Sequence, residues 1–258
     1  MDNLELRFAA RDIQLAVRSF SVTEELSTPF DISIVARSHD DDIDLDALVG
    51  HGAAFKVAGS LAWSGIVNFA EQVDVEPDGL STYFIRIVPA LSRTTLRRNN
   101  RIFQHLSIPD IAKKLLADWE IEPLLELDYA AFPRLDYRVQ YGETDFGFLS
   151  RLLEEAGISY LFRAPDPGSE APSKLVLVAD PGAIDSRGSL LYINNLEHAK
   201  GVDAITHVKI SHQVRPGRMT LRDHDFRRRP DFQLIADAKS TLDSESRYES
   251  YHYAPGAF

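Results

Sequence analysis

Apolar and polar residues alternate along much of the chain, which is the pattern of half-buried β-strands. The alternation is clearest at 30–36, 83–88 and 205–211. Residues typical of turns separate the alternating segments, at 38–42, 76–79, 165–173, 180–182 and 215–217. The longest of these turns predicts an exposed hairpin tip. Many short strands divided by turns favour a barrel or a sandwich.

A helical period replaces the alternation in the middle of the chain, over 144–156. Thr144 is a suitable N-cap, and Asp145 places a negative charge at the positive end of the helix dipole. Gly157 suits a left-handed C-terminal cap. One face of this helix carries the apolar residues Phe146, Leu149, Leu152, Leu153 and Ala156.

Strand patterns surround that helix, at 137–141, 158–162 and 174–179, so the region predicts a β-α-β-β run. A second helix is predicted over 107–119, with Ser107 as its cap and Pro109 in its first turn. Its apolar face holds Ile108, Ile111, Ala112, Leu115 and Trp119. A shorter helix is predicted within 43–50, before Gly50.

The helices cluster centrally while both flanks have strand patterns, which predicts an α+β, mostly β, fold class. We expect two barrel-like β domains with a small α/β insertion between segments that pair across it. The predicted division is a first barrel-like domain at 1–95, then the α/β portion with the start of a second barrel-like domain at 96–200. Residues 201–258 supply β segments that complete the barrels. The closing residues "RYESYHYAPGAF" are aromatic and turn-like, as expected at a domain border.

Composition narrows the class of protein. The 258 residues are 44% hydrophobic and 26% charged, and no apolar run approaches the roughly 18 residues of a membrane span. The N-terminus lacks the basic start and apolar block of a signal peptide, which predicts synthesis in the cytosol. The absence of cysteine excludes disulfides, thiolate metal sites and cysteine nucleophiles in this chain.

The net charge of −11 opposes nonspecific binding to nucleic acid or to an anionic membrane. The densest basic cluster, Arg227, Arg228 and Arg229, is short, and it is interpreted as a solvated turn. Neither nucleic acid nor a membrane span is therefore expected.

The acidic run "DDDIDLD" places Asp42, Asp44 and Asp46 at the spacing that begins a calcium-binding loop. The rest of that motif is missing, because Ala47 occupies the position of its glycine and Ala53 that of its bidentate glutamate. A solvated loop is the expected structure.

His224 lies between Asp223 and Asp225, with His212 and His207 upstream, so a metal or general-base site is conceivable there. On a strand, however, His224 faces away from both aspartates.

The sequence contains no nucleophile elbow, P-loop or dinucleotide fingerprint. The adjacent Glu154 and Glu155 diverge by about 100° on a helix, which suits a glycosidase pair poorly. No catalytic, cofactor-binding or metal-ligating residue is assigned, and neither a cofactor nor an enzymatic activity is expected.

The segment "VQYGETDFGFLSRLLEEAGISYLF" resembles the signature QYxETDxxFxxRLLEExGIxYxF of VgrG spike proteins of type VI secretion systems. Further segments follow in the order of that family, including "EELSTPFDISIVARS", "WSGIVNFAEQV", "RTTLRRNNRIFQHLSIPDIAKKLL", "PGRMTLRDHDFRRRP" and "YESYHYAPGAF". The resemblance covers essentially the whole chain.

This resemblance implies a structural hub similar to that of phage tails and to phage late control protein D. Three subunits would form a pseudo-six-fold ring that adapts a six-fold Hcp tube to a three-fold spike. The implied partners are two further copies, the Hcp tube, baseplate proteins, effector or adaptor proteins and, through an OB-fold and needle beyond this segment, a PAAR tip. The implied location is the bacterial cytoplasm before firing, and the extracellular space or the target cell afterwards.

Two alternatives stay open at this stage. One is a phage or phage-derived tail hub. The other, from a different class, is an envelope-targeting hydrolase that would use Asp223, His224 and Glu143. Glu143 is also expected to form an ion pair with Arg151 or to contact another subunit.

Overall fold

The computed structural model describes residues 4–57, 61–75, 79–164, 173–184, 189–194, 204–229, 234–242 and 245–254. The chain divides into two compact units, Met1–Asp185 and Ser186–Phe258, and each is described by itself. The long turn predicted at 165–173 lies almost entirely outside the described residues.

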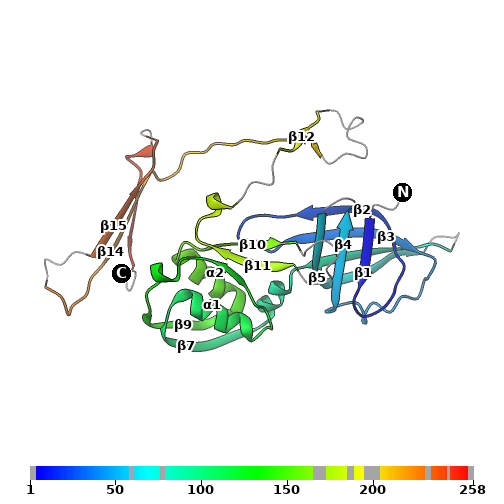
Figure 1. Ribbon diagram of the computed structural model, residues 1–258, viewed down its shortest axis with the longest axis horizontal. Helices are drawn as coiled ribbons and strands as arrows, with labels where there is room; N and C mark the ends of the chain where they lie inside the picture. The colour runs from blue at the N-terminus through cyan, green and yellow to red at the C-terminus, as the bar shows by residue number, and fades with distance from the viewer. Residues whose placement is uncertain are drawn as a thin grey trace. The chain divides into compact units, whose positions relative to one another are not determined.

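The first unit begins with a six-stranded antiparallel sheet that curls toward a half-barrel (Figure 1). Its strands follow the order β1-β4-β5-β6-β3-β2, so β1 and β2 form the two edges. Their bounds are β1 Leu4–Phe8, β2 Ala16–Thr23, β3 Asp31–Ser38, β4 Gly52–Val57, β5 Leu61–Val75 and β6 Ser81–Val88. The strands predicted at 30–36 and 83–88 are confirmed as parts of β3 and β6.

The core of this sheet follows from the alternation in the sequence. Ile32, Ile34 and Ala36 of β3 are buried, as are Tyr83, Ile85 and Ile87 of β6, while the residues between them are partly or fully exposed. β5 is 15 residues long, and its pairing with β6 shifts register twice. Such bulges increase the local twist and bend a strand, which fits the curl of the sheet.

A helical portion follows within the same unit. The 3-10 turn η1 (Ala90–Leu96) leads into β7 (Arg98–Leu106), α1 (Ile108–Ala117) and β8 (Leu124–Glu126). After the 3-10 turn η2 (Tyr129–Ala131) come β9 (Leu135–Thr144), α2 (Asp145–Glu155), β10 (Ser159–Arg163), β11 (Lys174–Val178) and the 3-10 turn η3 (Pro181–Ala183). The predicted β-α-β-β run and both longer helices are confirmed.

Local sequence explains where these helices begin and end. Ser107 and Asp110 form a capping box at the start of α1. The Thr144 hydroxyl accepts a hydrogen bond from the Gly147 N–H at 3.0 Å, and Gly157 has φ +65° directly after α2.

The two helices lie between a β7–β9 ribbon and a sheet of order β10-β11-β8 (Figure 1). Their shared core includes Phe103 of β7, Phe148 of α2 and Leu177 of β11. Phe148 was absent from the predicted apolar face of α2, yet it is fully buried, whereas Phe146 is only partly buried.

Backbone and ring contacts join the helical portion to the six-stranded sheet. Ser27 and Tyr160 exchange two hydrogen bonds, Ser27 N–H to Tyr160 O at 2.8 Å and Tyr160 N–H to the Ser27 hydroxyl at 3.2 Å. The rings of Phe30 and Phe162 meet edge to face at 5.2 Å. The helical portion and the sheet therefore pack as one body.

The helix predicted within 43–50 is wrong. The chain forms a turn there, in which Leu45 O accepts from the N–H groups of Leu48 and Val49 at 3.0 and 3.1 Å. Gly50 then adopts φ +83°, which ends the turn and directs the chain into β4, so the turn does not continue as a helix.

The second unit contains a sheet of order β15-β14-β16, with β14 at Arg218–Asp223, β15 at Leu234–Lys239 and β16 at Glu249–Tyr253. A short parallel pair, β12 (Leu191–Tyr192) and β13 (Ala204–Ile205), precedes it. No apolar side chain that the structure describes in this unit is buried. In the described parts of the chain, the strands of each flank pair only within that flank.

The strand predicted at 205–211 is also wrong beyond Ile205. Residues 206–216 have no regular structure, and all of them are exposed. Their alternation is genuine, but within the described residues no neighbouring strand or core buries one face of the segment.

Candidate functional site

The six-stranded sheet leaves an open seam, because its edge strands β1 and β2 do not pair with each other. β1 pairs only with β4, and β2 pairs only with β3, among the strands that the structure describes. The Ala9 N–H bonds to Gly52 O on the β4 side. By alternation, the backbone groups of Leu4, Leu6 and Phe8 point toward the seam.

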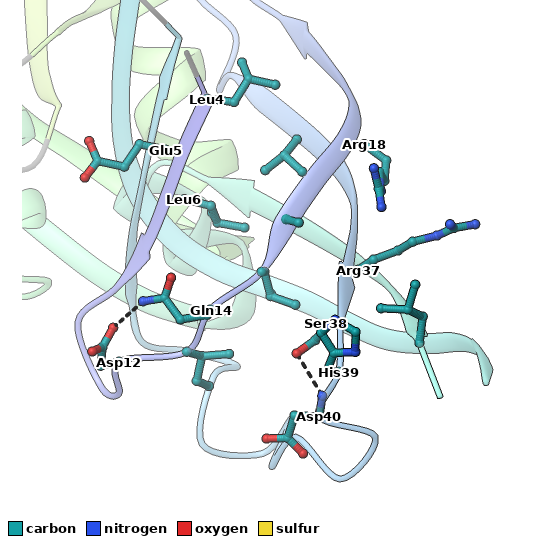
Figure 2. Close-up of a pocket in the computed structure, with 15 residues that line it drawn as sticks. Leu4, Glu5, Leu6, Asp12, Gln14, Arg18, Arg37, Ser38, His39 and Asp40 are labelled. Carbon is teal, nitrogen blue, oxygen red and sulfur yellow. Dashed lines mark hydrogen bonds between the residues drawn. The ribbon is translucent and has the colours of Figure 1, made fainter. Parts of the chain in front are cut away.

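A groove of about 1150 Å³ follows the seam. Apolar side chains of Leu6, Ile13, Leu15 and Val17 line its floor and pack on the sheet core. Figure 2 shows Leu4 and Leu6 of β1 projecting toward β2. The groove is therefore an opening between two strand edges, lined by apolar side chains.

Charged and polar residues form the rim of this groove: Glu5, Asp12, Gln14, Arg18, Arg37, Ser38, His39 and Asp40. Gln14 Nε2 donates to Asp12 Oδ1 at 3.0 Å, and the Asp40 N–H donates to the Ser38 hydroxyl at 3.1 Å (Figure 2). These local bonds hold rim residues in place. An apolar floor with a polar rim is typical of a surface for a protein segment.

A second feature is the buried carboxylate of Asp145, which is fully inaccessible to solvent. Four side chains donate hydrogen bonds to it, from β7 and the residue before it, from the turn after α1 and from β9. The donors are Arg97 Nε at 2.7 Å, Arg101 Nη2 at 2.6 Å, Trp119 Nε1 at 2.9 Å and Gln140 Nε2 at 2.8 Å. The Asp145 N–H also donates to Arg97 O at 3.0 Å.

Further contacts connect the donors of this cluster to one another. Asp118 accepts from both Arg97 and Arg101, at 3.0 and 2.7 Å. The Arg97 guanidinium lies 4.6 Å from the centre of the Trp119 ring, a cation–π contact. The cluster therefore ties the start of α2 to β7, to the end of α1 and to β9.

Burial alone would raise the pKa of Asp145, because a charged group loses hydration. Hydrogen bonds from Gln140, Trp119 and Arg97 and the positive charge of Arg101 outweigh this effect and hold the pKa below its ordinary value. Asp145 is thus an anion whose acceptor sites are all occupied. The cluster therefore joins parts of the fold, and neither oxygen of Asp145 is open to a substrate.

The ion pair predicted between Glu143 and Arg151 is confirmed. Arg151 Nη2 lies 2.6 Å from Glu143 Oε1, and the same guanidinium donates to Val139 O and to Glu155. Hydrogen bonds from Arg151 lower the pKa of Glu143 against the opposing effect of burial. Glu143 therefore ties the end of β9 to the middle of α2.

Asp42, Asp44 and Asp46 are exposed on a loop, while Ile43 between them is buried. Asp44 bonds to Arg11 at 3.1 Å and accepts from the Ala47 N–H at 3.2 Å. The Asp42 N–H donates to Asp40 Oδ1. Within the described residues, no group of three or more His, Asp or Glu side chains is arranged to hold a metal ion.

β14 ends at Asp223, so the alternation argument fails for His224 and Asp225, which follow the strand. The Asp223 carboxylate accepts from the His224 N–H at 2.7 Å. Asp225 accepts from Arg227 and lies 3.7 Å from Arg228, so this basic cluster is a turn that pairs with its own aspartate. His207 and His212 are exposed residues of the segment without regular structure.

The Asp145 cluster is what sequence reasoning missed. Asp145 was interpreted only as a charge in the first helical turn, while its partners lie 48, 44, 26 and 5 residues away. The one partner close in sequence is Gln140, five residues before Asp145, and its burial is seen only in the structure. The remaining partners depend on tertiary packing.

Comparison with known proteins assigns the chain to a family. The sequence family described as "Phage tail baseplate hub (GPD)" matches residues 23–258. The chain belongs to this family. The hub chain is also 31% identical over 255 residues to the type VI secretion system spike protein VgrG4b of Pseudomonas aeruginosa, covering 95% of this chain and 30% of that protein.

A second relative is the spike protein VgrG5 of the same organism, with 29% identity over 249 residues, 94% of this chain and 30% of that protein. The hub chain is thus homologous to VgrG spike proteins over most of its length. It spans about 30% of the length of these curated relatives.

Solved structures support the same fold. The Escherichia coli c3393 protein is described as a type VI secretion component similar to the T4 tail proteins gp27 and gp5. It matches with a TM-score of 0.65 at 24% identity, covering 73% of the hub chain and 52% of that chain. A tail protein from Neisseria meningitidis matches with a TM-score of 0.58 at 15% identity, covering 98% and 69%. A Francisella PdpA-VgrG complex matches with a TM-score of 0.56 at 11% identity, covering 93% of the hub chain and 36% of that chain.

The hub chain is therefore mostly β, with a curled half-barrel sheet and a fold like that of tail hubs. No helix among the described residues has the length and apolar character needed to cross a membrane.

Proposed function

We propose that this chain is the structural hub of a contractile injection machine of the type VI class. In this role it forms a three-subunit ring that adapts a six-fold Hcp tube to a three-fold spike, and it supports effector delivery without catalysing a reaction. The observation that carries the proposal is homology to VgrG spike proteins along 95% of the chain.

The arrangement of charged residues supports a structural role. Asp145 is saturated by four donors, and Glu143 is held by Arg151. Catalytic carboxylates instead need an open face toward a substrate. The open seam on the half-barrel offers unpaired strand edges, which suit assembly with another polypeptide.

The proposed partners are two further copies of the chain, the Hcp tube, baseplate proteins and effector or adaptor proteins. One solved VgrG relative is described in complex with PdpA. The proposed path is from the bacterial cytoplasm before firing to the extracellular space or the target cell. The proposed domain division stays at 1–95, 96–200 and 201–258, with two barrel-like β domains.

Co-assembly with the tube protein tests this function. The purified chain is mixed with the Hcp protein encoded in the same genome, and complexes are separated by size and imaged by negative-stain electron microscopy. We expect a ring of three hub chains seated on a six-fold Hcp ring. Intact Hcp rings that bind no hub chain at micromolar concentration would contradict the proposal, and Hcp alone is the control.

A phage-derived tail hub is the second candidate, favoured by the family description and by the Neisseria tail protein. The same mixing experiment, carried out with a phage tail-tube protein encoded in the same genome as the hub chain, separates the type VI hub from the phage-derived hub. Preferential capture of the phage tube would select this alternative.

An envelope hydrolase is the candidate from another class. Incubation of the chain with purified cell-wall glycan tests it. Release of soluble fragments that is abolished by Glu143→Ala in a folded variant would contradict the purely structural role.

A further inference from the structure

Two serines join the helical portion to the six-stranded sheet in the same way. Ser27, in the turn between β2 and β3, donates its N–H to Tyr160 O at 2.8 Å, and its hydroxyl accepts from the Tyr160 N–H at 3.2 Å. Ser173, just before β11, donates its N–H to Ser64 O at 3.2 Å, and its hydroxyl accepts from the Ser64 N–H at 2.9 Å. Each serine thus holds both backbone groups of one residue across the joint, and we call each such pair a serine clasp.

Strand pairing leaves the backbone groups that the clasps hold available. Both backbone groups of Tyr160 bond to Ser27, so they point away from β11, the neighbour of Tyr160 in the sheet. Ser64 lies on β5, and β6 pairs with β5 only from Ile66 onward. Ser173 occupies the place beside β5 that β6 leaves. The clasps therefore link the two sheets with directional bonds.

The clasps hold the β10–β11 hairpin at two separate points. Tyr160 is the second residue of β10, whereas Ser173 precedes Lys174, which pairs with Arg163 at the other end of that strand. From Tyr160 to Arg163 the strand rises by about 10 Å. Two points at this separation restrict a rotation of the hairpin that one point would allow.

The apolar contact between the same two parts has no preferred direction. The Phe30 ring, buried in the core of the six-stranded sheet, meets the Phe162 ring at 5.2 Å, and Phe162 packs against both cores. Apolar burial stabilises in proportion to the area removed from water and is non-directional. This contact therefore favours association of the two parts without selecting one angle between them.

The backbone conformation of Ser27 indicates a constraint at the joint. Ser27 has φ +57°, in the left-handed region that residues other than glycine rarely adopt. Such residues persist where the surrounding structure fixes them, and they mark functional constraints. Ser27 is exposed, so core packing does not explain its conformation. The conformation instead places its N–H and its hydroxyl against the one residue Tyr160.

We propose that Ser27 and Ser173 set the angle between the half-barrel and the helical portion, while Phe30 and Phe162 hold the two parts together. The two parts then move as one rigid body, without a hinge between them. In the proposed hub, a force on one part is passed to the other. The inference concerns a single chain, so it goes beyond the proposed hub function and can fail without affecting it.

A distance measurement between two spin labels tests the proposal, because the chain has no cysteine of its own. Ser21→Cys on β2 and Lys113→Cys on α1 place the labels on exposed residues of the two parts. With both clasps present we expect one narrow distance distribution, and Ser27→Ala combined with Ser173→Ala should broaden it. Labels at Lys113 and Glu154 both lie in the helical portion, and their distribution should stay narrow.

Two further variants separate orientation from stability. Ser27→Gly removes the hydroxyl but relieves the backbone strain, so the thermal unfolding of the chain should change little while the distance distribution still broadens. Ser173→Thr keeps both the hydroxyl and the N–H, so it should keep the distribution narrow where Ser173→Ala broadens it. Ser19→Ala, which removes an exposed hydroxyl outside the clasps, is the matched control.

Hydrogen exchange supplies an independent measurement. The two parts swing only when both clasps open, so the loss of one clasp makes the opening of the other easier. Ser27→Ala should therefore speed exchange of the Ser64 N–H, in the clasp that is left intact, by up to about tenfold, the effect of one net hydrogen bond.

The outcomes separate the possibilities. A distribution that stays narrow without either hydroxyl overturns the proposal, as does unchanged exchange of the Ser64 N–H in Ser27→Ala. A double variant that loses its circular dichroism also overturns it, because the apolar contact then fails to hold the parts together. The hub function is judged separately, by co-assembly with Hcp.

Discussion

Replacing Asp145 by alanine tests how strongly the buried cluster holds the helical portion together. The substitution removes a fully buried anion that accepts from four side chains, and it leaves Arg97 and Arg101 with only Asp118 as a carboxylate partner. Breaking a buried charge pair by removing one partner costs about 3–5 kcal/mol. Because a domain is stable by only about 5–15 kcal/mol, this loss is a large share of the total.

The assay is urea unfolding followed by the fluorescence of Trp119, which donates to Asp145. The chain has two tryptophans, so Trp63→Phe in every variant makes Trp119 the only reporter. Asp145→Asn, which keeps the volume and loses the charge, is expected to cost roughly 2–3 kcal/mol, the value of hydrogen bonds to a charged group. Asp118→Asn is the matched control, because it contacts the same two arginines from a side chain that is 43% exposed, and it should cost no more than about 1 kcal/mol.

The pH dependence gives a second readout of the same cluster. Since the pKa of Asp145 is lowered in the folded state, its stabilising effect is complete above the unfolded pKa near 3.8 and is lost as the pH falls through the lower folded pKa. The stability difference between the original chain and Asp145→Asn should therefore be constant above about pH 5 and shrink below about pH 4. Equal stability of Asp145→Asn and Asp118→Asn at pH 7 would refute the reasoning.

Three further predictions concern single positions in the first unit. Thr144→Ala removes the cap of α2 and should lower the unfolding free energy by about 1 kcal/mol in the same urea assay, with Thr144→Ser restoring most of it. Gly65→Ala places a Cβ 2.2 Å from Val88 O, so β5 and β6 must separate, and thermal unfolding should show a loss of about 1–3 kcal/mol. Burial raises the pKa of Tyr160 to about 12. The unfolding free energy of the original chain should therefore fall as the pH rises from about 10 toward 12. Tyr160→Phe should remove the part of this fall that is due to Tyr160. An absorbance titration in which every tyrosine of the folded chain ionises near pH 10 would contradict this last expectation.

The elements that sequence predicts best are those set by neighbouring residues. Thr144 and Gly157 bound α2, and Ser107 bounds α1, because caps act within four residues of the helix ends. The alternation of β3 and β6 is equally local, since each strand buries one face against the same core. These features require no knowledge of the distant chain.

Features that depend on distant partners were not predictable in this way. The strand pattern at 205–211 is as regular as that of β3, yet only Ile205 pairs with a neighbouring strand among the described residues. The sequence around Asp145 is typical of any helix start. The burial of Asp145 follows only when β7, the turn after α1 and β9 converge on it. The open seam arises from the order of six strands, which periodicity does not encode.

The mass of the assembled chain tests the central claim most directly. Sedimentation equilibrium of the purified chain over a range of concentrations distinguishes a monomer of 28.9 kDa from a hub ring of three copies. The account predicts a species of about 87 kDa, three times the chain mass. A mass that stays at 28.9 kDa at every concentration and salt condition would contradict it.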